Sequence, residues 1–461
     1  MVRILLIGNG AREHVIAETL KRSRYDVEIF AVGKTKNPGL SALAEDYLLA
    51  DVVDKNAIAD FAKRVNPSFA ILGPEAPIAA GIADMLLEME IHSVAPLQTV
   101  GRLESSKSFT RDLLEKYGIE GNPKFKVFYE ESGMEEFFNE LGEDYVVKAD
   151  GLKGGKGVMV SGDHLNGIAE GLAYARECLA DGGRVVVEEK LVGQEFSLMS
   201  FCDGKHTVEM PAVQDHKRAY EGDKGPNTGG MGTYSCADHS MPFLRENDLA
   251  IASDITAKVA KALFEETGCY FKGVMYGGFM AVKNGVRLIE YNARFGDPEA
   301  MNVLPLLKTD FVDVCQAIIN GDLDNLNLEF EKKATVCKYV VPKGYPDNAV
   351  KGARIDLSEL LELVRVIEDQ TEQLCKNNEV EKAKMGQLKF YYASVDQRED
   401  GLYLAGSRAI AVVGISPGLE PAEGIAQAGA ESVKGPVFYR KDIGTQALID
   451  AKVEMMRQIR A

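Results

Sequence analysis

Short apolar runs alternate with amphipathic stretches over residues 1–103 of the chain. Residues 2–7, 27–32 and 69–73 are apolar runs, and residues 12–22 carry apolar side chains at helical spacing. Short continuous apolar runs are typical of strands buried on both faces, and the amphipathic stretches between them are typical of helices. This alternation predicts a doubly wound parallel sheet as the first domain.

Beyond residue 103, strands and helices follow one another less regularly. A helix is expected over residues 105–117, with Ser105 or Ser106 at its N-cap. Further strands are expected over residues 144–149, 158–161, 184–189 and 286–292, and a further helix over residues 167–179. We interpret residues 104–189 and 190–327 as two α+β lobes, the first of which covers a nucleotide site.

Residues 328–461 predict a final α+β domain, with strands over 335–341 and 402–413. No internal repeat, low-complexity tract or long Gly/Ser linker separates the predicted units, so we expect four domains packed together. The predicted fold class is therefore multi-domain α/β, with an N-terminal doubly wound parallel sheet and a C-terminal α+β domain.

Acidic residues outnumber basic ones, 70 to 53, which gives a net charge of -17. Such a surface repels nucleic acid and anionic membranes, so neither is an expected partner. The seven cysteines are odd in number and form no CxxC pair, which favours reduced thiols in a cytoplasmic protein. No segment has the ~18 apolar residues that a membrane span needs, and the N-terminal run is too short for a signal peptide.

A glycine-rich turn follows the first predicted strand and opens the first predicted helix. Its sequence GNGAREH, residues 8–14, begins like a dinucleotide fingerprint, but Glu13 stands where a third glycine is needed for close helix–sheet packing. NAD binding is therefore disfavoured. Backbone N–H groups at the helix N-terminus, with Arg12 beside them, favour a single phosphate group instead. A tight turn without a ligand explains these residues equally well.

A second glycine-rich loop, residues 151–157, follows Lys148 and carries two further lysines, Lys153 and Lys156. The loop is not a Walker A motif, because Gly157 follows Lys156 where Ser or Thr is required. Glycine at this density excludes a packed helix or strand. We interpret the loop as a flap over a polyphosphate, with a solvated hairpin turn as the alternative.

The strand expected over residues 286–292 leads into an unusual set of polar side chains. Because side chains alternate along a strand, Glu290, Asn292 and Arg294 share one face. Carboxylate and amide oxygens are ligands that Mg²⁺ accepts, and a guanidinium beside them binds phosphate oxygens. The alternative is the polar outer face of an edge strand, which would use the same residue types.

Two further words combine charged residues with glycine: QDHKR at residues 214–218 and GPNTGGMG at residues 225–232. The glycines indicate a backbone that folds closely around something, and Asp215 could hold an ammonium group. From these residues alone, an ordinary surface loop is the better explanation.

Together these segments resemble the glycinamide ribonucleotide synthetase family of the ATP-grasp superfamily. The matching words stand in the family's order at residues 8–14, 73–77, 106–110, 148–152, 214–218, 225–232 and 294–299. QDHKR and GPNTGGMG are specific to this family within the superfamily, and RKDIG at residues 440–444 fits its ending. The resemblance implies an ATP-grasp fold for the two central lobes. It also implies ATP-dependent ligation of glycine to 5-phosphoribosylamine, through a glycyl phosphate.

The same resemblance implies which residues hold ATP and its metal ion. The expected contacts are Lys107 and Lys148 at the phosphates, Gly154, Gly155, Lys156 and Gly157 in the flap, Glu188, Glu189 and Leu191 at adenine, Glu195 at ribose, and Glu290 and Asn292 at Mg²⁺ or Mn²⁺.

The substrate residues are implied in the same way. Asp215 would orient the glycine ammonium, and Arg294 would neutralise the transferring phosphoryl group or the glycine carboxylate; with Lys148 these are the expected catalytic residues. The residues expected at phosphoribosylamine are Gly10, Arg12, Glu13 and Glu75, and those expected to line the rest of the substrate pocket are Lys217, Asn227, Thr228, Gly229, Gly296 and Asp297.

Three other functions fit the residues less well. Another ATP-grasp carboxylate–amine ligase would lack QDHKR and GPNTGGMG. A non-catalytic nucleotide-binding module would tolerate loss of Glu290 and Asn292, and both are present. A dinucleotide oxidoreductase is disfavoured by Glu13. The expected partners are therefore the small molecules glycine and 5-phosphoribosylamine, and we expect a monomer.

Overall fold

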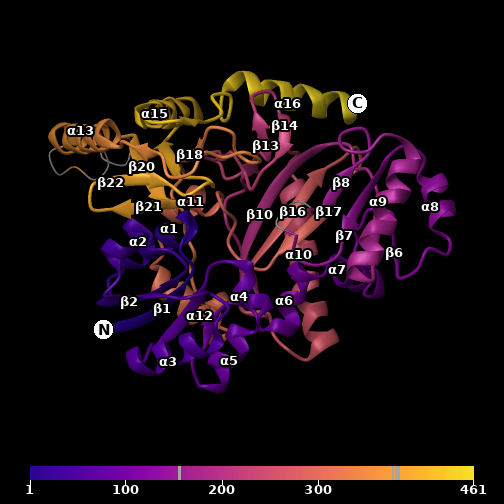
Figure 1. Ribbon diagram of the computed structural model, residues 1–461, viewed down its shortest axis with the longest axis horizontal. Coiled ribbons are helices and arrows are strands. Elements are labelled where there is room, and N and C mark those ends of the chain that lie inside the picture. The colour runs from indigo at the N-terminus through magenta and orange to yellow at the C-terminus, as the bar shows by residue number, and fades with distance from the viewer. Residues whose placement is uncertain (154–156, 376–377, 379–384) are drawn as a thin grey trace.

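The computed structural model describes residues 1–153, 157–375, 378 and 385–461 (Figure 1). Its N-terminal unit is a five-stranded parallel sheet in the order β3-β2-β1-β4-β5. The strands are β1 (Val2–Ile7), β2 (Val27–Gly33), β3 (Asp46–Leu49), β4 (Phe69–Leu72) and β5 (Ser93–Val94). The helices are α1 (Ala11–Lys21), α2 (Pro38–Leu43), α3 (Lys55–Val65), α4 (Glu75–Ala79), α5 (Ile82–Glu88) and α6 (Gln98–Ser105).

Both faces of this sheet are buried, as the apolar runs predict. Along β1, Ile4 and Leu6 enter one apolar core, and Leu5 and Ile7 enter a second core on the other face. The strand order reverses direction between β1 and β4, and ligands of open α/β sheets bind outside the carboxyl ends of the strands at such a point. The doubly wound prediction is confirmed, and this topology directs attention to the residues that follow β1 and β4.

The next unit is a four-stranded antiparallel sheet in the order β6-β9-β7-β8. Its strands are β6 (Phe125–Phe128), β7 (Tyr145–Ala149), β8 (Val158–Val160) and β9 (Val185–Glu189), and its helices are α7 (Lys107–Lys116), α8 (Met134–Leu141) and α9 (Gly167–Gly182). Ser106 is the N-cap of α7, because its side chain accepts a hydrogen bond from the backbone N–H of Phe109 at 3.3 Å. Of the two expected caps, Ser105 belongs to α6 instead.

A second lobe is built on the sheet β11-β10-β16-β17, which lies beside the first lobe in Figure 1. Its strands and its long helix are β10 (Gln194–Cys202), β11 (Thr207–Glu209), β16 (Gly273–Ala281), β17 (Val286–Asn292) and α10 (Asp248–Thr267). Around them lie β12 (Gln214–Asp215), β13 (Arg218–Tyr220), β14 (Lys224–Asn227), β15 (Gly232–Ser235), α11 (Ala300–Val303), α12 (Phe311–Asn320) and the short 3-10 helices Leu304–Leu306 and Leu323–Asn325.

The C-terminal residues complete a six-stranded sheet with β12-β15-β18-β23-β20 as its main path. The elements are β18 (Ala334–Pro342), β19 (Arg354–Ile355), α13 (Ser358–Cys375), β20 (Gln387–Tyr392), β21 (Val395–Arg398), β22 (Gly401–Leu404), β23 (Ile410–Ser416), α15 (Leu419–Ser432), β24 (Val437–Phe438) and α16 (Gln446–Ile459). Because β15 pairs with β18, this sheet takes strands from both sides of residue 328. The four predicted domain ranges therefore stay predictions.

One predicted strand is wrong. Residues 402–413 form two strands, β22 and β23, which belong to different sheets. Gly406 lies between them at a φ of +94°, a conformation that ends an extended run. The interruption leaves Ser407 and Arg408 outside both strands, where they line a cavity described below. Within the described part of the chain, no helix combines the length and the apolarity that a membrane crossing requires.

Candidate active site

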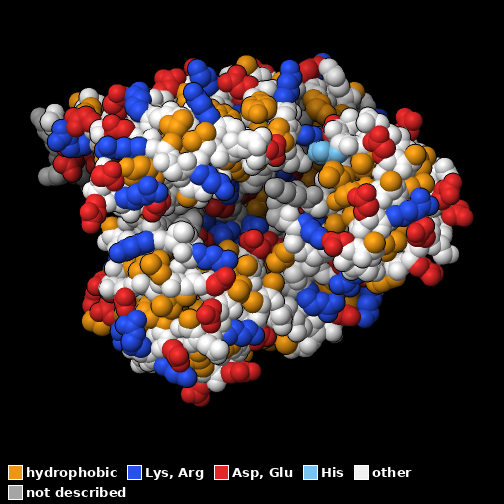
Figure 2. Space-filling view, in the orientation of Figure 1, with side chains coloured by type: hydrophobic (Ala, Val, Ile, Leu, Met, Phe, Trp, Pro, Cys, Tyr) orange, Lys and Arg blue, Asp and Glu red, His pale blue; other side chains and the backbone are white. Residues whose placement is uncertain are grey.

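A cavity of about 300 Å³ lies between the N-terminal sheet, the second lobe and the C-terminal unit. Figure 2 shows a hollow near the middle of the molecule's face, with basic and acidic side chains gathered in it. Polar and charged residues from all three parts of the chain line the cavity, among them Asn9, Gly10, Arg12, Asp297, Ser394 and Arg408.

The turn after β1 is shaped by the side chain of Glu13. Its Oε2 accepts the backbone N–H of Gly10 at 2.6 Å, and its Oε1 accepts from Arg12 Nε at 2.7 Å. A Cβ atom at Gly73, just after β4, would stand only 2.0 Å from Glu13 Oε1. Glu13 therefore fills the space at the switch point and lies in the cavity wall, where it orients Arg12. Its side chain also fills space that the third glycine of a dinucleotide fingerprint would leave empty.

Arg12 joins this turn to the second lobe. Its Nη1 donates to the backbone carbonyl of Phe295 at 3.1 Å. Burial opposes the charged form of Arg12, but Glu13, Asp297 and Glu75 outweigh it and raise the pKa of the guanidinium. The cavity thus has a permanently charged cation held at the N-terminus of α1, as an anion site requires.

Arg111, Glu188 and Lys148 form a buried cluster, and two of them, Glu188 and Lys148, are expected at ATP. The Glu188 carboxylate accepts from Arg111 Nε at 2.6 Å, from Arg111 Nη2 at 3.0 Å and from Lys148 Nζ at 2.8 Å. These side chains are at most 5% exposed. Burial alone would raise the pKa of Glu188, but Arg111 and Lys148 outweigh it and hold the pKa below its usual range. Both oxygens of Glu188 are engaged by these two cations, so its side chain positions Lys148, and its expected contact with adenine stays a prediction.

A β-bulge sets which way the polar side chains of β17 point. Gly278 of β16 pairs with Glu290, but the next residue, Phe279, pairs with Leu288, so Ile289 is an extra residue in β17. Before the bulge, Leu288 is buried with the apolar core; after it, Tyr291 is. The insertion therefore turns Glu290 out of the core. The carbonyl of Ile289 accepts from Lys148 Nζ at 2.9 Å and from Arg111 Nη2 at 2.7 Å.

Glu290, Asn292 and Arg294 lie together beyond this bulge, as their alternation predicts. Arg294 Nη2 donates to Asn292 Oδ1 at 3.1 Å and forms an ion pair with Glu104 Oε1 at 3.0 Å. The Nε of Arg294 is buried and has no hydrogen-bond partner among the described residues. Its distance to Glu75 Oε2 is 3.7 Å, too long for a direct hydrogen bond. One donor of this guanidinium is therefore left for a ligand.

The carboxylate of Glu290 is held in its charged form. Burial by itself would raise the pKa of Glu290, but Lys217, Lys148 and Lys107 together keep it below its usual range. Among the described residues, no group of three or more His, Cys, Asp and Glu side chains forms a closed metal site. An ionised carboxylate beside an amide oxygen suits a hard cation that keeps part of its coordination shell for substrate phosphates.

The expected glycine contact, Asp215, lies deep in the site. Burial, and after it the nearby Glu299, raise the pKa of Asp215 well above its usual range. Lys217 opposes this rise, but its ammonium is engaged by Glu195 Oε1 at 2.6 Å. Glu195 therefore holds Lys217 in this structure. A cation that binds beside a carboxyl group with a raised pKa stabilises its ionised form.

Arg408 connects the C-terminal unit to the second lobe. Its Nη1 donates to the carbonyls of Gly229 at 2.6 Å, Gly230 at 3.1 Å and Asp297 at 2.9 Å. Its Nη2 forms an ion pair with Asp297 Oδ1 at 3.2 Å, and Tyr339 donates to the same oxygen at 2.6 Å. One guanidinium thus fixes both the GPNTGGMG loop and the carboxylate of Asp297.

Other expected residues have local partners. Lys107 Nζ donates to the carbonyl of Gly151 at 2.9 Å, and Gly157 accepts from the backbone of Ala149 at 2.8 Å. Thr228 donates to the carbonyl of Lys217 through its N–H at 2.7 Å, and Glu189 accepts from the N–H of Lys124 at 2.8 Å. Asn227 ends β14, Leu191 follows β9 and is half-buried, and Gly296 is buried against Glu299. Gly154, Gly155 and Lys156 lie outside the described residues.

Comparisons with known proteins agree with this geometry. Three family models match consecutive parts of the chain: the N domain of phosphoribosylglycinamide synthetase at residues 2–104, its ATP-grasp domain at residues 105–300 and its C domain at residues 335–446. The phosphoribosylamine–glycine ligase of Methanosarcina barkeri is 46% identical over 459 residues, which cover 100% of both chains. The chain belongs to the phosphoribosylglycinamide synthetase family.

Other relatives extend this likeness. The phosphoribosylamine–glycine ligase of Methanocaldococcus jannaschii is 46% identical over 100% of both chains. The crystal structure of phosphoribosylamine–glycine ligase from Thermotoga maritima matches 96% of this chain and 100% of its own, with a TM-score of 0.76 and 26% identity. The biotin carboxylase domain of a Hydrogenobacter thermophilus 2-oxoglutarate carboxylase, solved with ADP, shares the fold at 14% identity and a TM-score of 0.68.

Within this synthetase site, several residues escaped sequence reasoning. Arg111 and Glu104 pair with expected residues over long separations in sequence, and Arg408 comes from another domain, so no local pattern announces them. Glu299 was part of a matching word, but its acidic side chain carried no assigned role. It is buried and accepts a hydrogen bond from Tyr276, which places it beside Asp215.

Proposed function

We propose that the chain catalyses the reaction of ATP, glycine and 5-phosphoribosylamine to give ADP, phosphate and glycinamide ribonucleotide, in de novo purine biosynthesis. The observation that carries this proposal is the full-length match to relatives named phosphoribosylamine–glycine ligase. The cavity, the cations around it and the buried carboxyl of Asp215 supply the matching chemistry.

The reaction needs activation of a carboxylate. Resonance and negative charge make glycine's carboxylate a poor electrophile towards an amine. A carboxylate oxygen attacks the γ-phosphorus of ATP, ADP leaves, and glycyl phosphate forms. The amine of phosphoribosylamine then attacks the glycyl carbonyl, loses a proton and expels phosphate. No protein nucleophile is needed, so positioning and charge neutralisation supply the catalysis.

The ATP subsite lies around Lys107, Lys148, Glu290 and Asn292. Lys148 uses two donors on Glu188 and Ile289, which leaves its third for a phosphate oxygen. Asn292 Oδ1 accepts one hydrogen bond and keeps a lone pair, so it and Glu290 fit Mg²⁺ or Mn²⁺. When bound, the metal would neutralise phosphate charge. Adenine would meet the backbone near Glu189 and Leu191.

Glycine is placed between Asp215 and Arg294. The ammonium of glycine supplies the cation that lets Asp215 ionise, and the unsatisfied Nε of Arg294 suits the carboxylate or the transferring phosphoryl group. Lys217, Asn227, Thr228, Gly229, Gly296 and Asp297 complete the wall of this subsite.

Phosphoribosylamine is assigned to the cavity. Its phosphate is expected near Gly10 and Arg12, at the N-terminus of α1. Glu75 is assigned to the same substrate, and its Oε2 lies 3.7 Å from Arg294 Nε. Lys34 lines the same cavity and adds positive charge. We also propose that the protein is cytoplasmic and monomeric.

Phosphate release from ATP tests the function. Wild-type protein is assayed with glycine alone, with freshly made phosphoribosylamine alone, and with both. We expect product only with both substrates, and its loss in Glu290→Ala. Glu454→Ala, an exposed carboxylate on α16 that pairs with Arg457, is the matched control. Absence of glycinamide ribonucleotide in every combination contradicts the proposal.

A further inference from the structure

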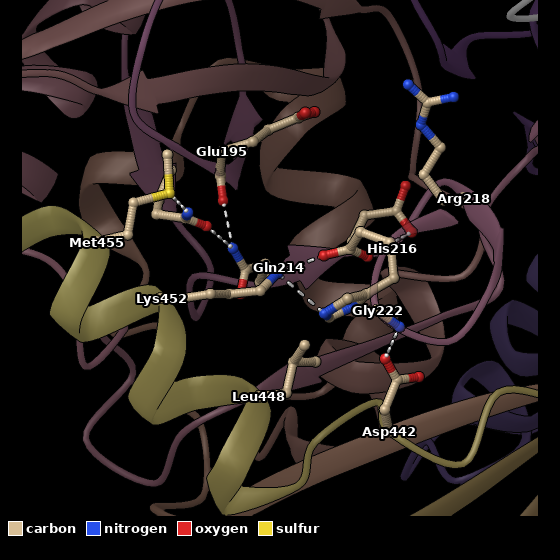
Figure 3. Close-up of polar contacts among 12 residues, drawn as sticks. Glu195, Gln214, His216, Arg218, Gly222, Asp442, Leu448, Lys452 and Met455 are labelled. Carbon is tan, nitrogen blue, oxygen red and sulfur yellow. Dashed lines mark hydrogen bonds and ion pairs between the residues drawn. The ribbon is translucent and has the colours of Figure 1, made fainter. Parts of the chain in front are cut away.

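The residues of the QDHKR word point in two directions. Lys217 forms an ion pair with Glu195, and Asp215 lies near enough to Glu299 for that carboxylate to raise its pKa. Both side chains therefore point towards the proposed substrate site. His216 lies between them in sequence and points the opposite way, towards the C-terminal helix α16 (Figure 3). Alternation along an extended chain explains the split. The middle residue of the word is therefore an anchor on the far side of the strand.

Two contacts fix the imidazole of His216. Its Nδ1 lies 3.2 Å from the carbonyl of Gly232, and its Nε2 lies 3.3 Å from Lys452 Nζ (Figure 3). A carbonyl oxygen only accepts, so Nδ1 carries the proton and Nε2 accepts from the Lys452 ammonium. Burial, then Lys452 and Arg440, lower the pKa of His216 well below its usual range, with Asp442 opposing them. The ring is thus neutral and held in one tautomer.

The segment before α16 also contacts the hairpin formed by β13 and β14, which follows His216 in the chain. Arg440 Nη1 donates to the carbonyl of Arg218 at 3.0 Å and to Asp223 Oδ1 at 2.8 Å. Asp442 Oδ2 accepts the N–H of Gly222 at 2.9 Å. The hairpin β13–β14 is therefore held at its first strand and at its tip, and Lys452 holds the residue that leads into it.

The placement of Lys452 is costly for a residue with a packing role alone. Its side chain is buried, and burial lowers the pKa of its ammonium, with Asp223 3.7 Å away opposing the shift. It lies on the same helix face as Leu448 and Met455, where an apolar side chain would fill the space without losing hydration. A donor at this position is explained by the lone pair of His216 Nε2 at 3.3 Å, together with the carboxylate of Asp223 at 3.7 Å.

We propose that Lys452 is a positioning residue of the glycine subsite, which acts through His216 to keep Asp215 and Lys217 facing the substrate. This inference rests on the proposed ligase function. The main chain supplies the link, because the backbone N–H of His216 donates to Asp215 Oδ1 at 2.7 Å. β12 has only two residues and lies at the edge of its sheet, so it needs such lateral support.

Kinetics of Lys452→Met test the role. This change keeps the length of the side chain and removes its charge and donors. We expect the KM for glycine to rise about tenfold, which corresponds to ~1.4 kcal/mol, and the KM for ATP to change less than about twofold. Arg457→Met, on the exposed face of the same helix, is the matched control and leaves both constants unchanged. An unchanged glycine KM, or an equal rise for ATP, overturns the proposal.

Nitrogen NMR of wild-type His216 gives a second test that needs no ligase activity. The signals are assigned by their absence in His216→Gln. We expect the neutral Nδ1–H tautomer from pH 5 to 8, and a shift of both ring nitrogens when glycine is added. A protonated ring, the other tautomer, or no response to glycine overturns the proposal. Failure of the ligase function would instead show as absence of product from wild-type protein.

Discussion

Two arginine clusters in this site differ in how completely their charges are matched. Arg111 shares Glu188 with Lys148, and its remaining donors meet backbone carbonyls and Asn122. Arg294 keeps one buried donor without a partner among the described residues, and its carboxylate neighbour Glu75 stays 3.7 Å away. The first cluster is complete without a ligand. The second keeps an unsatisfied donor, to which we expect an anion to bind.

This difference distinguishes residues that stabilise the fold from residues that are expected to act on the substrates. Buried charges that satisfy one another fix the shape of the protein, and their loss costs stability. Charges left partly unmatched are stabilised by substrate, so their loss costs activity. Lys148 belongs to both groups, because Glu188 and the carbonyl of Ile289 engage two of its donors, and we expect the third to meet ATP.

The largest expected effect is on Arg294. Arg294→Met removes the cation that meets the reacting anion, so kcat/KM falls ~10³-fold, about 4 kcal/mol in transition-state stabilisation. Folding changes little, because burial already raises the pKa of Glu104 and lets it become neutral once its partner is gone. Steady-state kinetics and thermal melting of the same variant measure both. A large drop in melting temperature with activity retained would show that Arg294 supports the fold and not the reaction.

The complementary change is Glu188→Gln. It leaves Arg111 and Lys148 buried without their counter-charge, so the free energy of unfolding falls by about 3–5 kcal/mol. The control is Glu189→Gln, because this half-buried neighbour's carboxylate accepts a hydrogen bond from Lys124 N–H and forms no ion pair among the described residues, and we expect a loss below about 1 kcal/mol. Denaturant titration measures both. Equal losses in the two variants would show that the buried cluster contributes no more to the free energy of unfolding than the hydrogen bond of Glu189 does.

Arg408→Met tests the contact between the C-terminal unit and the second lobe. Losing the bonds to Gly229, Gly230 and Asp297 loosens the cavity wall, so the KM for glycinamide ribonucleotide in the reverse reaction rises ~10–30-fold, about 2 kcal/mol. The control is Arg398→Met, an exposed ion-pair residue of the same unit. A similar KM in both variants would show that Arg408 does not contribute to binding glycinamide ribonucleotide.

The smallest effect concerns His14, which joins the N-terminal and C-terminal units. Its Nδ1 accepts the N–H of Tyr392 at 3.1 Å, and Asn37 donates to the carbonyl of the same residue at 2.6 Å. Burial lowers the pKa of His14 from 6.5 to about 4, so the folded protein binds fewer protons than the unfolded chain between these values. The stability that His14 contributes is present above pH 6.5 and is lost as the pH falls towards 4.

Between pH 7 and pH 5 this linkage removes about 2 kcal/mol from the free energy of unfolding. In His14→Gln, which does not titrate, that part of the pH dependence disappears. Urea titrations at several pH values compare the two slopes. Identical slopes would mean that His14 is protonated in the folded state or does not accept from Tyr392.

Local patterns predicted much of this molecule. The bounds of β1 and β17 agree with the expected strands, because continuous or alternating apolar residues fix them. The shared face of Glu290, Asn292 and Arg294 was also predicted, although an unbroken strand would have placed Glu290 with Leu288 in the core. The bulge at Ile289 resolves this conflict, and it depends on pairing with β16, which sequence does not display.

What could not be predicted depends on long-range contacts. Residues 402–413 read as one strand because both halves are apolar, and only the pairing of β22 and β23 with different partners divides them. The ion pair between Glu188 and Arg111 of α7 joins residues that are far apart in the sequence, so no local pattern predicts it. Likewise, nothing near His216 in sequence announces Lys452.

In the proposed reaction, glycine is activated by phosphorylation of its own carboxylate. Glycine labelled with ¹⁸O in both carboxylate oxygens tests it most directly, with ATP and phosphoribosylamine present and the released phosphate analysed by mass spectrometry. We predict that each phosphate carries one ¹⁸O atom and that the amide product keeps the other. Unlabelled phosphate released along with glycinamide ribonucleotide would show that the glycine carboxylate is not phosphorylated.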